Sequence, residues 1–260
     1  MEFQDIIYEK KDGVAKVTIN RPKVYNAFTS QTIDELIDAF QDAWTDGTVG
    51  VVVLTGTGDK AFCTGGDQKA RDKSGYGQAK YPGGVEYFHS LIRNIPKPVI
   101  AAVNGYAIGG GHVIHFICDI TIASETARFG QTGPRVGSVD PGFGTAYLAR
   151  VVGEKRAREI WYLCRQYTAQ EAYEMGLVNK VVPPDKLAEE VDIWCKEILA
   201  KSPTALRIAK FSFNADTDSI HGVSAMGHIA LGLYTQTEEA MEGLTAFQEK
   251  RPVDFSKFRK

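Results

Sequence analysis

The chain has 260 residues, of which 43% are hydrophobic and 24% are charged, and its formal net charge is −2. These values are ordinary for a globular enzyme with a sizeable core, and no apolar stretch reaches the length of a membrane-spanning helix. The small net charge excludes a bulk attraction for nucleic acid or for an anionic membrane.

Four cysteines lie far apart in the sequence and lack the paired spacing of a zinc site: Cys63, Cys118, Cys164 and Cys195. The first residues show no basic patch followed by an apolar run, so we expect no signal peptide. A reducing, cytoplasmic setting with free thiols is therefore expected.

The first predicted elements are a β-hairpin, a helix and a buried strand. Residues 6–8 and 14–19 alternate apolar and polar side chains around a turn that contains glycine, which is typical of a hairpin. Residues 29–44 carry apolar side chains at helical spacing. The continuous apolar run at 49–55 is typical of a parallel strand that is buried on both faces.

Strands and helices are then expected to alternate. After a surface loop at 69–84, we expect a helix at 85–94, a strand at 98–103 and a helix that begins near 113. Further strands are predicted at 117–123 and 127–130, and further helices at 148–152, 157–164, 169–175 and 185–200. This order predicts an α/β fold with a largely parallel sheet over residues 1–201, followed by a helical C-terminal region over residues 202–260.

Two glycine turns follow predicted strands: FCTGGD at 62–67 and GYAIGGG at 105–111. Glycine has no Cβ, so a ligand can lie directly against the backbone there. A strand, a glycine turn and a helix start together aim free N–H groups into one cleft, which suits a phosphate or an oxyanion. The alternative is a tight turn without chemistry. Because there are two such turns, we expect two N–H donors on one carbonyl oxygen.

Other interpretations of the second glycine turn are less satisfactory. The three glycines at 109–111 lack the spacing Gly-x-Gly-x-x-Gly of a dinucleotide-binding turn. His112 and His115 follow them, and we expect these side chains on different helix faces, as packing or capping residues. No third ligand accompanies them, so no metal site is expected.

The two glycine segments resemble the paired oxyanion-hole segments of the crotonase (enoyl-CoA hydratase/isomerase) superfamily. The resemblance runs from NRP at 20–22 and NA at 26–27 to FQEKR at 247–251, nearly the whole chain. It implies a spiral core of stacked ββα/βαβ turns with a helical C-terminal trimerisation region, and a trimer or hexamer. It also implies a CoA thioester whose carbonyl oxygen accepts hydrogen bonds from the amides of Gly66 and Gly110.

Residues that the superfamily's hydratases need are missing. Hydratases carry two catalytic glutamates, and the matching positions here hold Val113 and Gly133. Neither can transfer a proton, so we expect no addition of water across a double bond. Asp140 remains, in a turn rich in glycine and proline, where burial would raise its pKa and suit it to acid–base work. The alternative role for Asp140 is a helix N-cap before residues 145–148.

Within the superfamily, the segments at 131–133, 138–140 and 159–164 resemble a branch that makes or breaks C–C bonds in β-oxoacyl-CoA rings. One type, 2-ketocyclohexanecarboxyl-CoA hydrolase, adds water to a ring ketone and opens the ring. The other, 1,4-dihydroxy-2-naphthoyl-CoA synthase, closes a ring of o-succinylbenzoyl-CoA by a Dieckmann-type condensation. In the synthase type bicarbonate acts as a base, and its pocket would here comprise Gln131, Thr132, Gly133 and Trp161.

Two features favour the hydrolase. The segment SVDPG at 138–142 is similar to the hydrolase version, and the chain starts at its first strand without the additional N-terminal segment of many synthases. A third feature departs from both types. Their C-terminal tyrosine, which reaches a neighbouring subunit's site, falls at Thr235, so Tyr234 must supply the hydroxyl after a local shift, or the substrate differs.

The resemblance implies a mechanism. The amides of Gly66 and Gly110 would stabilise the enolate that forms as the ring C–C bond breaks. Asp140 would activate water or transfer the proton at the ring ketone, with Ser138 as hydrogen-bond support. Tyr76 would close over the ring, or is simply a tyrosine on the surface of its loop.

Eight residues are expected to contact coenzyme A: Lys23, Val24, Ala27, Ala61, Lys69, Arg71, Phe247 and Lys250. Lys69 and Arg71 would meet the phosphates, and Phe247 and Lys250 would contribute from another subunit. CoA would arrive as part of the acyl-CoA substrate, with no tightly bound cofactor. An alternative of a different class is that the protein has this fold but only binds CoA or RNA, without catalysis. The presence of Asp140 argues against a non-catalytic role, and the small net charge argues against RNA binding.

Overall fold

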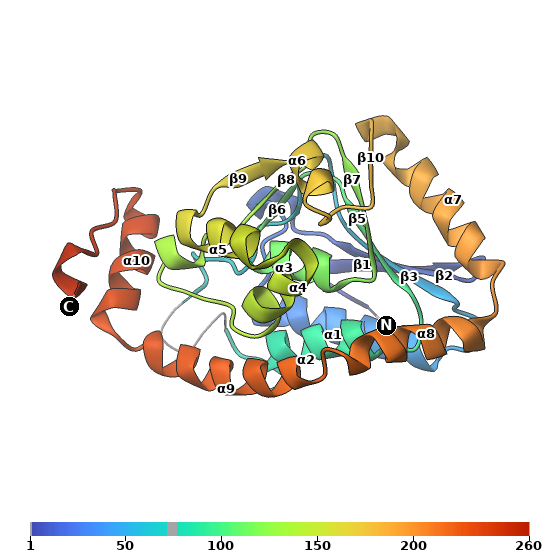
Figure 1. The fold of residues 1–260 in the computed structure, drawn as a ribbon, viewed down its shortest axis with the longest axis horizontal. Helices are drawn as coiled ribbons and strands as arrows, with labels where there is room; N and C mark the ends of the chain where they lie inside the picture. The colour runs from blue at the N-terminus through green and yellow to red at the C-terminus, as the bar shows by residue number, and fades with distance from the viewer. Residues whose placement is uncertain (1, 72–76, 260) are drawn as a thin grey trace.

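The computed structural model describes residues 2–71 and 77–259, and in this part of the chain the strands form two sheets (Figure 1). The larger sheet has the order β1-β2-β3-β5-β7-β10, and the smaller has the order β4-β6-β8-β9. The strands are β1 (Ile6–Lys11), β2 (Val14–Ile19), β3 (Val51–Gly56), β4 (Ala61–Cys63), β5 (Val99–Val103), β6 (Tyr106–Ile108), β7 (Ile120–Ser124), β8 (Arg128–Gly130), β9 (Gln166–Thr168) and β10 (Lys180–Val182).

Helices cover both sheets and make up the C-terminal region. They are α1 (Ser30–Thr45), α2 (Gly84–Asn94), α3 (Gly110–Ile117), α4 (Leu148–Val152), α5 (Glu154–Leu163), α6 (Ala169–Glu174), α7 (Leu187–Leu199), α8 (Pro203–Ala215), α9 (Ser219–Tyr234) and α10 (Glu238–Glu249). A single π-helical turn, η3 (Phe143–Tyr147), precedes α4 in the described chain. None of the helices described here combines the length and apolar character that crossing a bilayer requires.

The larger sheet begins with the predicted hairpin. β1 pairs antiparallel with β2, and the pairs β2–β3, β3–β5, β5–β7 and β7–β10 are all parallel. The parallel strands β3 and β5 are buried over almost their full length because helices cover both faces. The α/β fold, the largely parallel sheet and the helical C-terminal region are therefore confirmed.

The two faces of this sheet pack against different helices. On one face lies the main core, in which α1 and α2 contribute Phe40 and Phe88, whose rings meet edge to face with centroids 5.1 Å apart. On the other face α7 packs against β3, β5 and β7, with Leu187 and Val191 buried there. Figure 1 shows α7 along the outer side of the sheet, away from α1 and α2.

The smaller sheet is the main feature that the sequence did not predict. Its four strands are each three residues long. β8 was expected at 127–130, whereas the other three are too short to show a recognisable alternation of side chains. This sheet places the ends of β4 and β6 side by side, since these two strands pair in parallel. Both glycine turns therefore emerge at the same edge.

The helices after residue 202 lie along the underside of the core in Figure 1, with α8 and α9 end to end and α10 beyond them. α8 is fixed by Lys210, whose ammonium group is buried and donates to the carbonyl oxygens of Ile92 and Lys97 and to Asp119. α9 packs against α2 and against the π-helical turn η3. The four cysteines are free and buried.

Candidate active site

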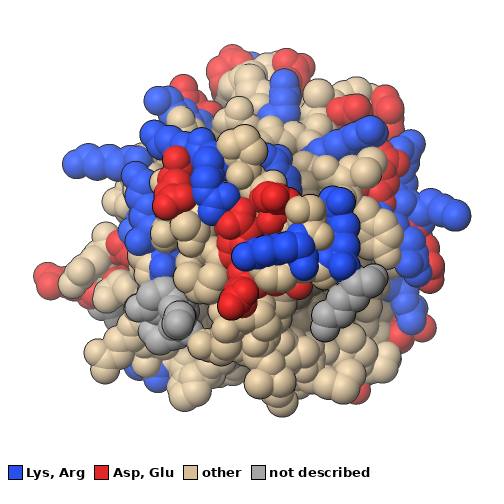
Figure 2. Space-filling model, turned by 90° about the vertical axis from the view of Figure 1, so that its left-hand side faces the viewer, with Lys and Arg blue, Asp and Glu red and all other residues tan. Residues whose placement is uncertain are grey.

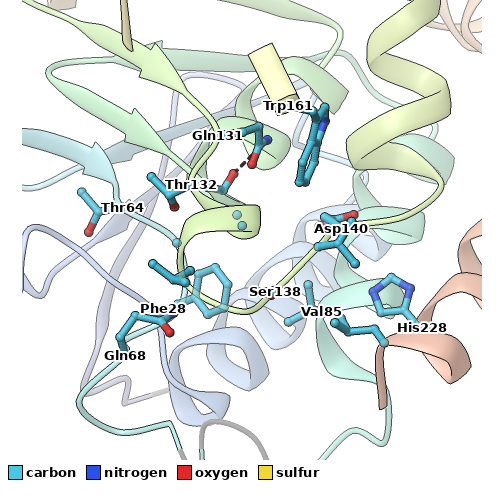
Figure 3. Close-up of a pocket in the computed structure, with 18 residues that line it drawn as sticks. Phe28, Thr64, Gln68, Val85, Gln131, Thr132, Ser138, Asp140, Trp161 and His228 are labelled. Carbon is cyan, nitrogen blue, oxygen red and sulfur yellow. Dashed lines mark hydrogen bonds between the residues drawn. The ribbon is translucent and has the colours of Figure 1, made fainter. Parts of the chain in front are cut away.

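A cavity of about 170 Å³ lies between the smaller sheet, α2, α5 and α9. The residues that line it come from seven separate segments of the chain (Figure 3): Phe28, Thr64, Gly65, Gly66, Gln68, Val85, Gly109, Gly110, Gln131, Thr132, Gly133, Val136, Ser138, Val139, Asp140, Trp161, His228 and Leu231. Both glycine turns, Ser138 and Asp140 are thus in the wall of one cavity.

The two glycine turns pack backbone against backbone. Gly65 has φ +81°, and a Cβ on it would lie 2.8 Å from the amide nitrogen of Gly110. Gly109 has φ +58°, and a Cβ on Gly111 would overlap the carbonyl oxygen of Cys63. No side chain fits between the turns, so glycine is required by space as well as by conformation.

The amides of Gly66 and Gly110 are oriented by the elements around them. Phe28 forms an isolated parallel β-bridge with Gly66. The N–H of Phe28 donates to the carbonyl of Gly65, and the carbonyl of Phe28 accepts from the N–H of Asp67. These bonds flank Gly66 without using its N–H. Gly110 is the first residue of α3, where amides have no intrahelical acceptor. Two amides at one cavity wall are what an oxyanion hole requires.

Residues of the NRP and NA segments form hydrogen bonds that hold the first glycine turn in place. Asn26 is fully buried with φ +55°, and its amide donates to the carbonyls of Ala61 (2.7 Å) and Thr57 (3.1 Å). Its Oδ1 accepts from the N–H of Arg21 (3.0 Å). Arg21 in turn contacts Asp67 beyond the glycines. The motif residues are therefore explained by their hydrogen bonds to the turn.

Asp140 combines the two roles considered for it. Its carboxylate lines the cavity, and Oδ1 also accepts from the N–H of Gly144 (3.2 Å) at the start of η3. Burial raises its pKa to about 6, and the negative Glu86 adds to this effect, whereas His228 and the Gly144 N–H oppose it. A carboxyl with a pKa near neutrality can both accept and return a proton. In the described chain it is the one carboxylate that lines this cavity.

His228 is a residue of the cavity that sequence reasoning missed. It lies on α9, 88 residues after Asp140, and Figure 3 shows its ring next to Asp140. The only signal in the sequence is a polar residue in the more apolar second half of the helix. Leu231, one turn further along α9, lines the cavity as well.

The residues expected to hold an anion gather at one end of the cavity. Gln131, Thr132, Gly133 and Trp161 all line it. The indole N–H of Trp161, however, donates to the carbonyl of Gly144 (2.6 Å), and the Gln131 amide approaches the carbonyl of Gly109 at 3.4 Å. These donors already have protein acceptors.

The positions of the hydratase glutamates are closed to such side chains. Val113 is fully buried in the core. A Cβ on Gly133 would lie 2.7 Å from the carbonyl oxygen of Ser138 and 3.0 Å from the ring of Trp161. A glutamate at 133 would therefore require the neighbouring loop to move.

The residues expected to contact CoA lie outside this cavity. Lys23 and Lys69 are exposed, Val24 is partly buried, and Ala27 and Ala61 are buried behind the first glycine turn. Phe247 is exposed at the end of α10, and Lys250 follows it. The side-chain amide of Gln248 donates to the carbonyl of Gln68 in the same chain, so the end of α10 lies beside the cavity's rim.

One expected position differs in the structure. Arg71 is buried, and its guanidinium donates to the carbonyls of Val136 and Gly137, so it holds a loop of the cavity instead of extending toward a phosphate. Tyr234, which was expected to reach a neighbouring subunit's site, is partly buried at the end of α9 and does not line the cavity of its own chain. Tyr76 lies outside the described residues.

The two histidines after the glycines are not on different helix faces, which corrects the sequence prediction. Residues three apart on a helix are neighbours, and Nε2 of His115 lies 2.9 Å from Nδ1 of His112. Both are fully buried, and burial holds their pKa values well below the usual range. No group of three or more metal-binding side chains is found in the described residues.

Two amides and a carboxylate around one cavity, in a spiral of parallel strands, define a crotonase-fold enzyme that processes CoA thioesters. A family model described as enoyl-CoA hydratase/isomerase matches residues 9–258. The chain belongs to this family.

Solved structures with similar folds extend over the whole chain. An enoyl-CoA hydratase from Mycobacterium avium subsp. paratuberculosis K-10 has a TM-score of 0.88 and 30% identity, covering 98% of this chain and 100% of that one. A carnitinyl-CoA hydratase from Mycobacterium avium has a TM-score of 0.86 and 30% identity, with coverage of 98% and 100%. An enoyl-CoA hydratase from Bacillus anthracis has 32% identity and a TM-score of 0.74, with coverage of 97% and 99%.

Proposed function

We propose that this enzyme opens the ring of an alicyclic 2-oxo-carboxyl-CoA thioester, similar to 2-ketocyclohexanecarboxyl-CoA, by adding water to a C–C bond. The observation that carries the proposal is the set of groups in the cavity. Two amides are available for a thioester oxygen, and a single carboxylate with a raised pKa lies nearby, whereas Val113 and Gly133 occupy the positions of the hydratase glutamates.

The proposed reaction begins at the ring ketone. Asp140 takes a proton from water as the water oxygen attacks the ketone carbon, with Ser138 as a hydrogen-bonding neighbour. The bond between this carbon and the α-carbon of the thioester then breaks. Its electron pair becomes an enolate whose oxygen accepts from the amides of Gly66 and Gly110.

The product follows from the return of the proton. Asp140 returns it to the α-carbon, and the former ketone carbon becomes a carboxylic acid at the other end of the opened chain, so the product is an open-chain CoA thioester with one added water. We assign the CoA phosphates to Lys69, which is exposed, and the pantetheine and adenine side to Lys23 and Val24, which reach the surface. Arg71 has a structural part in this proposal because its guanidinium is already bonded.

A second candidate is the ring-closing synthase. It is favoured by the gathering of Gln131, Thr132, Gly133 and Trp161 in the cavity wall, as a bicarbonate site would need. Bicarbonate binding there would require the indole N–H of Trp161 to exchange its bond to Gly144 for one to the anion. We therefore place the hydrolase first.

We also propose that the protein assembles as a trimer or hexamer through its C-terminal helices. Met226, Ile229 and Leu233 form a stripe on α9 and are 69%, 70% and 71% exposed. Figure 2 shows charged side chains gathered over the upper part of one side of the molecule and few over its lower part. An apolar helix face of this kind supports contact with a second copy of the chain. Phe247 and Lys250 would then lie near a neighbouring subunit.

Two substrates distinguish the candidates by mass. Incubation with 2-ketocyclohexanecarboxyl-CoA is expected to give a product heavier by one water, and incubation with o-succinylbenzoyl-CoA is expected to leave the substrate unchanged. Loss of one water from the second substrate, with no reaction of the first, would establish the synthase instead. Crotonyl-CoA serves as the control for hydratase activity, which we expect to be absent.

A further inference from the structure

A second cavity, of about 460 Å³, lies where β3 and β5 begin, whereas the glycine turns come after these strands end. It is bounded by the end of α1, by the loops that lead into β3 and β5, and by the junction of α7 and α8. Figure 1 shows this junction at the far end of the molecule from α10, whose last turn lies beside the rim of the active-site cavity. The two cavities share no lining residue, so the second one is a separate site.

Lys97 contributes a nearly buried positive charge to the wall of this second cavity. It is 9% exposed, and its Nζ donates to the carbonyl oxygens of Ala43 and Asp46 at the end of α1. These carbonyls accept its hydrogens but carry no net negative charge. In the described chain no carboxylate forms an ion pair with Lys97, and that of Asp46 pairs with Lys10 at 2.6 Å. A buried ammonium group without a carboxylate partner favours the binding of an anion nearby.

Two more positive side chains line the second cavity, Lys201 at the junction of α7 and α8 and Arg207 on α8. Both are exposed, and among the described residues neither side chain has a hydrogen bond or an ion pair. Burial lowers the pKa of Lys97, Asp46 opposes this effect, and the positive Arg207 adds to it, so the charges lie near one another. No carboxylate lines the cavity in the part of the chain that the structure describes. Because the whole chain has a net charge of −2, three cations without an anion are a local feature and not a result of composition.

An aromatic side chain without a partner lies in the same wall. Trp44, near the end of α1, lines the second cavity and is 38% exposed. Among the described residues its indole N–H has no acceptor and its ring has no aromatic neighbour. Pro96, Pro98 and Leu206 add apolar surface. The indole therefore offers a flat face on which an aromatic ligand can stack.

We propose that the second cavity binds a small aromatic anion, whose ring lies against Trp44 and whose acidic group is held by Lys201 and Arg207. The charge of Lys97 adds to the attraction. The volume falls within the range of about 300–1,000 Å³ that is usual for small-molecule sites. The described lining contains no carboxylate, histidine, cysteine or serine that could act on the ligand, so the site binds without chemistry. This inference goes beyond the proposed ring opening and does not depend on it.

The first experiment follows the tryptophans by ¹⁹F NMR in protein labelled with 5-fluorotryptophan. The chain has three tryptophans: Trp44 lines the second cavity, Trp161 lines the active-site cavity, and Trp194 lines neither. Trp44→Phe and Trp194→Phe assign the three resonances. The probe is 1-naphthyl phosphate, with 1-naphthol as the ring alone and inorganic phosphate as the charge alone.

We expect 1-naphthyl phosphate to shift the Trp44 resonance to saturation, with an affinity about tenfold or more above that of either half. An unmoved Trp44 resonance overturns the site, as does a shift of Trp161 alone, which would place the probe in the active-site cavity. Equal binding of 1-naphthol would show an apolar hollow only. Equal binding of inorganic phosphate would show an adventitious ion only. Either of these results also overturns the proposal.

The second experiment removes the two exposed cations together. In the double variant Lys201→Gln, Arg207→Gln, we expect the affinity for 1-naphthyl phosphate to fall about tenfold or more. The matched control is Lys155→Gln, Lys196→Gln, which removes the same charge from two exposed residues outside the second cavity and should bind as the wild type does. Equal losses in the two double variants would show attraction by overall charge, and no loss in the first would show that its cations do not hold the anion. Both outcomes overturn the site, and neither bears on the ring-opening reaction, which uses the other cavity.

Discussion

Gly65 and the amide nitrogen of Gly110 are so close that a Cβ on Gly65 would lie 2.8 Å from that nitrogen. One methyl group is therefore enough to push the two donor turns apart. We expect Gly65→Ala to lower kcat/KM about 10²–10³-fold, the usual effect of losing one oxyanion donor. Steady-state kinetics measures this loss.

The matched control for this change is Gly58→Ala. Gly58 has a similar φ of +86°, but a Cβ there has no neighbour within 4 Å. Both variants carry the same kind of backbone strain, and only one disturbs the cavity. Equal losses of activity in the two variants would show that strain, and not the approach of the two turns, is responsible.

Asp140 makes stability depend on pH. Burial raises the pKa of Asp140 from its usual value of 3.8 to about 6 in the folded protein, so the native state favours the protonated form. The stability that the protonated carboxyl contributes is fully present below about pH 4 and is lost as the pH rises through about 6. At pH 7.5 the buried carboxylate therefore costs about 3 kcal/mol of unfolding free energy.

Asparagine cannot ionise, so Asp140→Asn should be more stable than the wild type at pH 7.5 by up to about 3 kcal/mol, with a smaller difference near pH 4.5. It should also abolish turnover. Urea denaturation at the two pH values and a fixed protein concentration measures the difference. A stability gain that is the same at both pH values would mean that the carboxylate of Asp140 is not held in a desolvated site.

The sequence predicted the parts of the site that are local in the chain. Gly66, Gly110 and Asp140 each lie in a short segment whose glycines indicate a turn, and the structure brings them to one cavity. The position of His228 depends instead on how α9 packs against the loop at 141–142, which ends 86 residues earlier in the chain. Helix packing of this kind leaves no periodic pattern in the sequence.

Two errors of the sequence analysis have a common cause. Arg71 was expected at a phosphate and is buried against the carbonyls of Val136 and Gly137, 65 residues further along the chain. The strand β8 was expected at 127–130, but the other three short strands of the smaller sheet were missed because each is stabilised by its partner strands and not by its own composition. In both cases the contacting residues lie far apart in the sequence, so the chemistry of a single residue does not predict the contact.

The apolar stripe on α9 predicts how the subunits assemble. Replacing Ile229, which is 70% exposed, by aspartate places a charge in the proposed contact. We expect light scattering after gel filtration to show a smaller assembly than that of the wild type, because a buried unpaired charge opposes association. Ile208→Asp on α8 is a control of similar exposure, at 64%. An unchanged mass for Ile229→Asp would place the contact elsewhere.

The ammonium group of Lys210 connects α8 to the core. Lys210 is 6% exposed, and its Nζ lies 2.7 Å from Oδ2 of Asp119 and 3.0 Å from each of the carbonyl oxygens of Ile92 and Lys97. Lys210→Met keeps the apolar stem and removes the charge. It leaves Asp119 without its cation and two carbonyls without a donor, so we expect a loss of about 3 kcal/mol in unfolding free energy by urea denaturation. Lys186→Met, which removes an exposed pair with Glu189 at 2.9 Å, should cost far less because water screens that pair. If both variants lost the same small amount, α8 would be held by its apolar contacts and not by this ion pair.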